Sequence, residues 1–162
     1  MDHPNIVRVH EWFEENGTAY IVMRRINGRT LETLIETDGP PPPERVDRWL
    51  RSLLAALDSV HQRNLLHRDI NPRNIVVTTQ DEPVLIDFGA ARQCIGKVSQ
   101  QIDVIVSPGY SPLAQYDELG LEEQGPATDL YALGATMYHV VTGTKPLAAT
   151  SRTSMDRLRP SQ

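Results

Sequence analysis

The chain has 162 residues, of which 40% are hydrophobic and 23% charged, so it is long enough to bury one core and is expected to fold mainly as one domain. Its formal net charge of −5 gives no electrostatic reason to expect a nucleic acid or an anionic membrane as a partner. The single cysteine, Cys94, favours a reducing compartment, and no signal peptide or membrane-spanning run is evident. These features predict a cytoplasmic protein without a nucleic-acid partner or a membrane segment.

A β-hairpin and a short helix are predicted near the N-terminus. Residues 6–13 alternate in polarity as a half-buried strand does, Asn16-Gly17 is a strong signal for a tight turn, and residues 18–23 form the return strand. Residues 27–29 are expected to form a turn, after which Thr30 can cap a short helix over residues 31–37.

Two longer helices are predicted further along the chain. Residues 40–43 are four prolines, which indicate a stiff connector, and Pro43 can occupy the first turn of the helix that follows. Apolar residues spaced three and four apart from Val46 to Val60 predict an amphipathic helix whose tryptophan and leucines belong to the core. A later helix is expected to end at Gly143, and the polar chain from Thr144 onward is interpreted as loop or disorder.

A second hairpin, in the middle of the chain, carries polar residues at its open end. Two short runs rich in β-branched residues, 75–77 and 84–86, flank a polar turn that closes with proline. Asp69 and Asn74 precede the first strand and Asp87 follows the second, so the hairpin would bring two acids and an amide together. This is the set of groups that magnesium-dependent phosphoryl transfer requires.

The same stretch resembles the signature motifs of protein kinases, in particular bacterial, eukaryotic-like serine/threonine protein kinases. The run from His67-Arg68-Asp69 to Asn74 is similar to the catalytic loop, and Asp87-Phe88-Gly89 is similar to the magnesium-binding tripeptide 18 residues after Asp69. The resemblance implies an α+β, protein-kinase-like fold with a partial small-lobe β-hairpin and a mainly helical, incomplete large lobe. We expect residues 1–147 to form this partial kinase domain and residues 148–162 to form a polar tail.

The resemblance also implies roles for individual residues. Asp69 would orient the substrate hydroxyl and accept its proton, and Arg68 would pair with a phosphate on the activation segment. Asn71 and Asn74 complete the catalytic set, and Asn74 would bind Mg²⁺ together with Asp87. The residues expected to act as structural anchors are His67, Phe88 and Asp129, the last by accepting hydrogen bonds from the backbone of the catalytic loop.

The implied ligands are ATP, Mg²⁺ and a protein substrate with an acceptor serine or threonine. Met23 would lie at the back of the adenine pocket, Arg24 and Ile26 would belong to the hinge whose backbone binds the adenine edge, and Val76 would lie beneath the ring. Asp87 would reach the phosphates through the metal.

The segment after Asp87 resembles the kinase activation segment. It contains Ser99, Ser107 and Tyr110. Ser99 and Ser107 are candidates for phosphorylation, although Ser107 could instead be a structural hydroxyl near Asp69.

The chain departs from the family pattern in several respects. Asn71 stands where most eukaryotic-type kinases have a lysine that contacts the transferring phosphate, although small polar residues occur there in the bacterial group that the chain resembles. Ala114 stands where a glutamate is usual. No Gly-x-Gly-x-x-Gly motif occurs in the sequence, and the final helices of the large lobe are also expected to be missing. We therefore expect a kinase core truncated at both ends, with little or no activity in isolation. A pseudokinase-like binding fragment is the alternative. A small-molecule phosphotransferase of the antibiotic-kinase type ranks below it, because those enzymes lack Phe88-Gly89 and the 107–116 segment.

Overall fold

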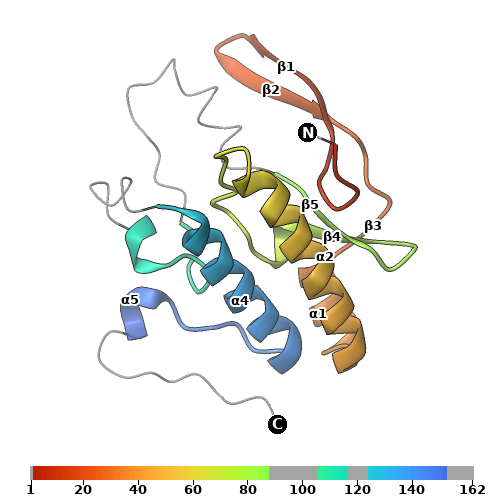
Figure 1. Ribbon diagram of the computed structural model, residues 1–162, viewed down its shortest axis with the longest axis vertical. Helices are drawn as coiled ribbons and strands as arrows, with labels where there is room; N and C mark the ends of the chain where they lie inside the picture. The colour runs from red at the N-terminus through yellow and green to blue at the C-terminus, as the bar shows by residue number, and fades with distance from the viewer. Residues whose placement is uncertain (1, 88–105, 117–123, 153–162) are drawn as a thin grey trace.

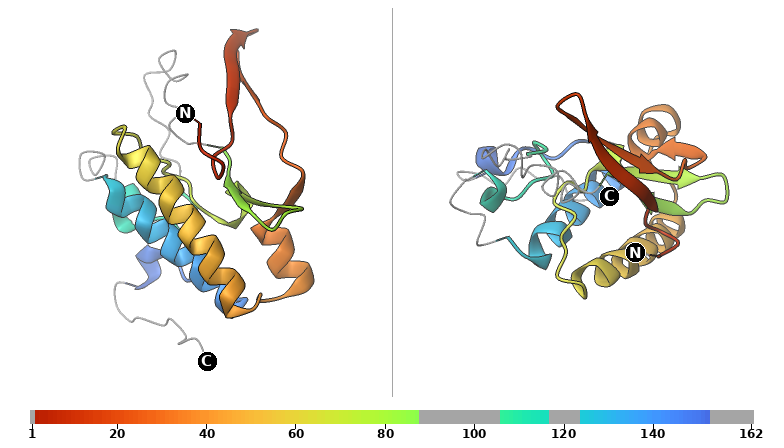
Figure 2. Two further views of the ribbon diagram at one scale, coloured as in Figure 1. Left: turned by 45° about the vertical axis from the view of Figure 1, so that its right-hand side comes forward. Right: turned by 90° about the horizontal axis from the view of Figure 1, so that it is seen from above.

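The computed structural model describes residues 2–87, 106–116 and 124–152, and these combine helices with antiparallel strands (Figure 1). Two long helices, α2 (Pro43–His61) and α4 (Pro126–Thr142), lie side by side, and a three-stranded sheet lies at the side of α2. A separate two-stranded ribbon projects away from the helices, as the left view of Figure 2 shows. None of the described helices is long and apolar enough to cross a membrane.

The projecting ribbon consists of β1 (Val9–Glu15) and β2 (Thr18–Met23), which pair in antiparallel fashion. The predicted tight turn is present, because Asn16 and Gly17 have φ angles of 52° and 69°. The prediction of a half-buried strand is wrong, since every residue of β1 is exposed. The ribbon extends away from the core, so the alternation in its sequence has no buried side to follow.

The three-stranded sheet has the order β3-β4-β5, with β3 at Gly28–Thr30, β4 at Ile75–Thr78 and β5 at Pro83–Leu85. The predicted hairpin at 75–86 is confirmed as the antiparallel pair β4–β5. The turn predicted at 27–29 is wrong in its second half, because Gly28 pairs with Thr78. A Cβ at Gly28 would lie 2.1 Å from the Val77 carbonyl oxygen, so glycine is required by this close approach and not by a turn.

The first helix, α1 (Leu31–Asp38), begins where the sequence predicted, with the hydroxyl of Thr30 accepting the Thr33 N–H at 3.1 Å. In α2, Pro43 occupies the first turn and the predicted apolar stripe is buried. Leu54 is an exception, because its side chain is 41% exposed and it therefore does not belong to the core. It follows the fully buried Leu53 by one position, which turns it about 100° away from the core side.

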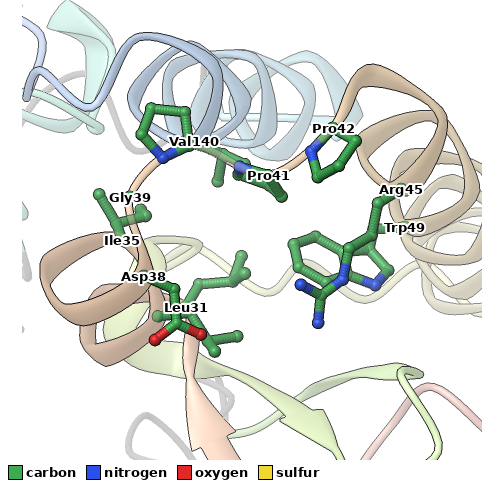
Figure 3. A pocket seen from close by; sticks show the side chains of 11 residues that line it. Leu31, Ile35, Asp38, Gly39, Pro41, Pro42, Arg45, Trp49 and Val140 are labelled. Carbon is green, nitrogen blue, oxygen red and sulfur yellow. The ribbon is translucent and has the colours of Figure 1, made fainter.

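The connector between α1 and α2 forms one wall of a cavity of about 130 Å³. Figure 3 shows Pro41 and Pro42 facing this cavity, with Leu31 and Trp49 on neighbouring elements and Val140 of α4 behind them. Pro42 has φ −58° and ψ 146°, which is the extended polyproline conformation. The proline run is therefore a stiff connector that lines this cavity together with residues of both long helices.

Helix α4 supplies much of the core and ends at Gly143, whose φ of 65° and N–H bond to the His139 carbonyl at 2.8 Å form a left-handed cap. The interpretation of everything after Thr144 as loop or disorder is wrong for α5 (Ala149–Arg152), a single helical turn. Ala149 is only 6% exposed, and Arg152 Nε donates to the Leu147 carbonyl at 2.9 Å, so both ends of this turn contact the rest of the chain.

Candidate functional site

The loop at residues 67–71, between α2 and β4, is tied to α4 by one buried carboxylate. Asp129 is fully buried and accepts the backbone N–H groups of His67 at 2.9 Å and Arg68 at 2.8 Å. Its Oδ2 also lies 2.8 Å from the ring of His61 at the end of α2. The contact that the resemblance implied between Asp129 and the loop backbone is thus present, and it joins the loop to both long helices.

Backbone strain marks the two ends of the candidate site. Arg68 has a φ of 66° and Asp87 a φ of 57°, in the left-handed region that non-glycine residues seldom adopt. Such conformations cost free energy and persist where the surrounding structure imposes them. Two hydrogen bonds hold Arg68 in this conformation. Asp129 accepts its backbone N–H, and the buried Gln115 donates from Nε2 to its carbonyl at 2.6 Å.

His67 is fully buried, and its ring bonds identify its protonation state. Burial lowers the pKa of His67, which favours the neutral ring at pH 7. Nε2 lies 3.2 Å from the Ile86 carbonyl oxygen, which can only accept, so Nε2 carries the proton. Nδ1 then accepts the Asp69 N–H at 3.4 Å. Both nitrogens hold backbone in place, which supports the anchoring role predicted for His67.

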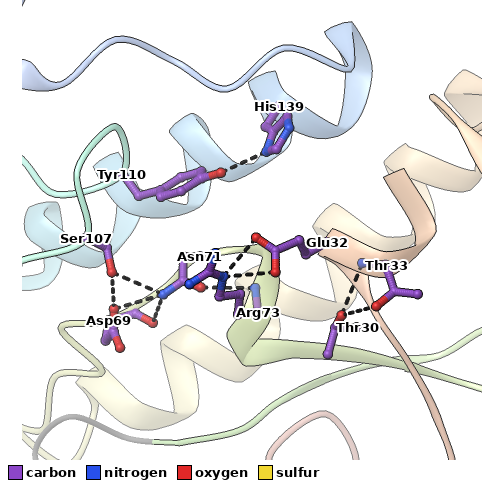
Figure 4. A network of polar contacts seen from close by, with 9 residues as sticks. All are labelled: Thr30, Glu32, Thr33, Asp69, Asn71, Arg73, Ser107, Tyr110 and His139. Atoms are coloured by element: carbon purple, nitrogen blue, oxygen red, sulfur yellow. Dashed lines mark hydrogen bonds and ion pairs between the residues drawn. The ribbon is translucent and has the colours of Figure 1, made fainter. Parts of the chain in front are cut away.

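The carboxylate of Asp69 is held by three side chains, and Figure 4 shows two of them, Asn71 and Ser107. Oδ1 accepts hydrogen bonds from Ser107 Oγ at 2.7 Å and from Asn71 Nδ2 at 2.8 Å. Oδ2 accepts from Asn74 Nδ2 at 2.8 Å. The structure therefore shows Ser107 as a hydroxyl bonded to Asp69, which was one of the two interpretations of this serine.

The β4–β5 hairpin brings Asp87 to the same place. Ile86 N–H donates to the Asn74 carbonyl at 2.9 Å, so the residue after it emerges beside the loop. Asp69, Asn74 and Asp87 line one cleft of about 370 Å³, as the sequence predicted. The amide nitrogen of Asn74 donates a hydrogen bond to Asp69, so its amide oxygen can bind a cation. Carboxylate and amide oxygens are the donors that Mg²⁺ prefers, so these residues fit a magnesium ion in kind.

Sequence reasoning missed several residues that line or support the cleft. They are Glu32, Arg73, Ser111, Gln115, His139 and Lys145. Gln115 and Ser111 had a usable signal, since they lie in the 107–116 segment that resembles the kinase motif, and Arg73 lies within the run from His67 to Asn74. Glu32, His139 and Lys145 come from other parts of the chain, and no local pattern marks them as belonging to the site.

Tyr110 and His139 form one side of this region. The Tyr110 hydroxyl lies 2.7 Å from His139 Nδ1. Burial, with Glu32 nearby, raises the pKa of Tyr110 to about 12. Burial and Lys145 lower the pKa of His139. The phenol therefore keeps its proton, and its hydroxyl donates a hydrogen bond to the neutral imidazole.

The residues predicted to bind the adenine lie elsewhere. Met23 and Arg24 are exposed at the end of the ribbon, Ile26 is half-buried in the following connection, and Val76 is buried in β4. None of them lines the cleft with Asp69 and Asp87. The Arg24 N–H also donates to the Arg8 carbonyl at 2.8 Å, which occupies one backbone donor expected to face the adenine. Phe88 and Ser99 lie outside the described residues.

Comparison with known proteins identifies the family and the fold. The family model described as protein kinase domain matches residues 1–161, so the chain belongs to the protein kinase domain family. The α+β kinase fold is confirmed by the solved structure "PpkA-294 apo form", with a TM-score of 0.79 and 36% identity over 99% of this chain and 56% of that one. A structure of Rad53 residues 1–466 in complex with AMP-PNP matches at 22% identity with a TM-score of 0.74 and shows the fold alone.

Curated relatives narrow the class to homologues of serine/threonine kinases. The chain is 35% identical to the serine/threonine-protein kinase PknD of Mycobacterium tuberculosis over 151 residues, which is 93% of this chain and 22% of that protein. It is 30% identical to PknB of Mycobacterium leprae over 176 aligned residues, covering 100% of this chain and 28% of that protein. The chain thus spans less than a third of the length of either relative.

Proposed function

We propose that this chain is the catalytic-loop core of a serine/threonine protein kinase, which transfers the terminal phosphoryl group of ATP to a protein hydroxyl with Mg²⁺. The observation that carries the proposal is the Asp69 carboxylate, oriented by three donors at one cleft with Asp87 and Asn74. Membership of the kinase family and the serine/threonine kinases among its relatives support the same reaction.

Asp69 would act on the acceptor hydroxyl in this reaction. Its carboxylate would accept the hydroxyl proton as the oxygen forms a bond to the terminal phosphorus, and the bond between that phosphorus and the bridging oxygen of ADP would break. The three side chains on Asp69 orient its carboxylate before substrate arrives. Asp87 and the amide oxygen of Asn74 would hold Mg²⁺, which supplies positive charge to the phosphates.

The proposal is tested by transfer of labelled phosphate from ATP to a serine peptide. We expect Asp69→Asn to lower transfer by at least about 100-fold, because the proton acceptor is lost while the shape is kept. The matched control is Asp58→Asn, the same change at an exposed position of α2, which should leave transfer unchanged. Transfer that persists in Asp69→Asn at the original rate contradicts the role of Asp69.

A second candidate, a binding module without turnover, is favoured by the position of Asn71. Its amide nitrogen is directed at Asp69 Oδ1 and lies 3.3 Å from Ser107 Oγ, so it is not free to contact a phosphate. If neither the wild type nor Asp69→Asn transfers phosphate while both bind a serine peptide, the binding module is the correct function.

A further inference from the structure

The cleft that contains Asp69 has lining residues that the proposed transfer does not use. Glu32 comes from the first turn of α1, Arg73 from the short 3₁₀ helix η1 (Pro72–Asn74), and Lys145 from the chain after α4. Tyr110 lies among them, and Figure 4 shows Glu32 and Arg73 on one side of Asn71 with Asp69 and Ser107 on the other. The cleft thus extends from the transfer site toward a second group of charged side chains.

Two of the acids in this cleft are already engaged by hydrogen-bond donors. The oxygens of Asp69 accept from Ser107 and two asparagines, and both oxygens of Glu32 accept from Arg73 Nε at 2.8 and 2.9 Å. The side chain of Arg73 is 75% exposed, and its terminal nitrogens make no hydrogen bond within the described part of the chain. Arg73 therefore retains donors that can face a ligand.

Lys145 is a cation without an acidic partner among residues 2–87, 106–116 and 124–152, and it is the only lysine in those ranges. Its ammonium lies 5.5 Å from the centroid of the Tyr110 ring, which His139 holds through the hydroxyl. A Cβ at Gly109 would lie 3.2 Å from Lys145 Cε and 2.6 Å from the Pro146 carbonyl oxygen. The stem of Lys145 thus packs against Gly109, and Lys145 is one of the residues that line the cleft.

We propose that Lys145 and Arg73 form an anion subsite for the protein substrate, so that the preferred acceptor serine or threonine has an acidic residue near it. The shared chemistry is a carboxylate or the phosphate of a phosphorylated side chain, either of which accepts hydrogen bonds from ammonium and guanidinium groups. A lysine or arginine of the substrate at the same place would face like charge. The inference rests on the proposed function for the identity of the ligand as a protein substrate.

Binding of short fluorescent peptides to the whole chain tests the subsite without requiring turnover. The peptides share a central serine and carry glutamate, phosphoserine or lysine on either side. Fluorescence anisotropy should show the glutamate peptide binding about five-fold more tightly than the lysine peptide, which is the size expected of partly exposed charge pairs. The phosphoserine peptide separates the two sources of anion, since tighter binding than glutamate identifies phosphate as the preferred group.

Variants at Lys145 assign the preference to the subsite. Lys145→Met keeps a stem that can pack on Tyr110 and should abolish most of the preference, while Lys145→Glu should reverse it. Arg51→Glu is the matched control, because this arginine is 77% exposed in α2, is paired with Asp47 and does not line the cleft. A preference that persists in Lys145→Glu, or that is lost equally in Arg51→Glu, overturns the inference.

Failure of the subsite and failure of the proposed reaction give different results. Phosphate transfer to the glutamate and lysine peptides at equal rates, with equal binding, overturns the subsite and leaves the kinase proposal intact. A preference for acidic peptides that depends on Lys145, without any phosphate transfer, supports the subsite and contradicts the reaction.

Discussion

Asp129 and His67 show how single buried polar residues set the geometry of the candidate site. Asp129 accepts two consecutive backbone N–H groups of the loop, which neither water nor a neutral side chain of the same size could bind as strongly. The ring of His67 connects the same loop to the β4–β5 hairpin, because it donates to the Ile86 carbonyl and accepts the Asp69 N–H. Neither residue faces the cleft, so their effect on chemistry passes through the position of Asp69.

The buried histidine predicts how stability depends on pH. Burial lowers the pKa of His67 below its ordinary value of about 6.5, so the unfolded chain binds this proton more readily than the folded chain. The free energy of unfolding should therefore fall as pH drops below about 6.5, by at most ~1.4 kcal/mol per pH unit from this group. The lowered pKa of His139 acts in the same direction.

Urea unfolding at about pH 7.5 and about pH 5.5 measures this effect. The loss of stability between the two pH values should be smaller in His67→Gln, which keeps an N–H donor and cannot titrate. His10→Gln, at an exposed position of β1, should lose as much stability as the wild type. An unchanged loss in His67→Gln would show that the histidine does not carry the dependence.

At the scale of elements, α2 connects the core to the loop. It carries a buried stripe that includes Trp49 and Leu53, packs beside α4, and ends at His61, which bonds Asp129. The same helix thus packs in the hydrophobic core and helps to hold the 67–71 loop in place. A substitution that weakens its packing should therefore affect both the stability of the core and the position of the loop. The β4–β5 hairpin contacts α2 through β5 and brings Asp87 to the same cleft.

Adjacent leucines of α2 allow a matched test of this packing. Leu53→Ala should lower the free energy of unfolding by ~2–5 kcal/mol, because Leu53 is fully buried. Leu54→Ala removes the same atoms from a side chain that is 41% exposed, and the free energy should change by about 0.5 kcal/mol or less. Equal losses in urea denaturation would contradict the assigned orientation of the helix.

At the scale of the whole molecule, the β1–β2 ribbon is an element with little support from the core, because every residue of β1 is exposed. Large apolar side chains are exposed along it: Val9, Trp12, Phe13, Tyr20, Val22 and Met23. The stacked rings of Phe13 and Tyr20, with centroids 5.2 Å apart, stabilise the ribbon internally. Exposed apolar strands are sites of association between molecules, so this ribbon should determine the behaviour of the isolated chain in solution.

Sedimentation velocity tests this expectation. The wild-type chain should self-associate as its concentration rises, and Trp12→Thr combined with Val22→Thr should shift it toward the monomer by removing apolar surface from the ribbon. Leu130→Thr is the control, since this side chain is 47% exposed but belongs to α4. A wild type that remains monomeric at all concentrations would contradict the expectation.

Local sequence patterns determined the elements that depend on neighbouring residues. The Asn16-Gly17 turn, the Thr30 cap, the stripe of α2 and the β4–β5 hairpin were all predicted, because each depends on residues a few positions apart. The motifs also located Asp69, Asn74 and Asp87, and the hairpin between them is short enough for the sequence to predict their meeting.

Tertiary structure decided the features that depend on partners far along the chain. Gly28 is in a strand because Thr78 pairs with it, and β1 is exposed because the ribbon projects from the core. Lys145 shares a cleft with Asp69 and Arg73 only because the chain after α4 converges there with the 69–74 stretch. The burial and the charge at a site depend on every element packed around it. The sequence of one segment therefore determines which chemical groups that segment carries, and the assembled fold determines which other groups surround them.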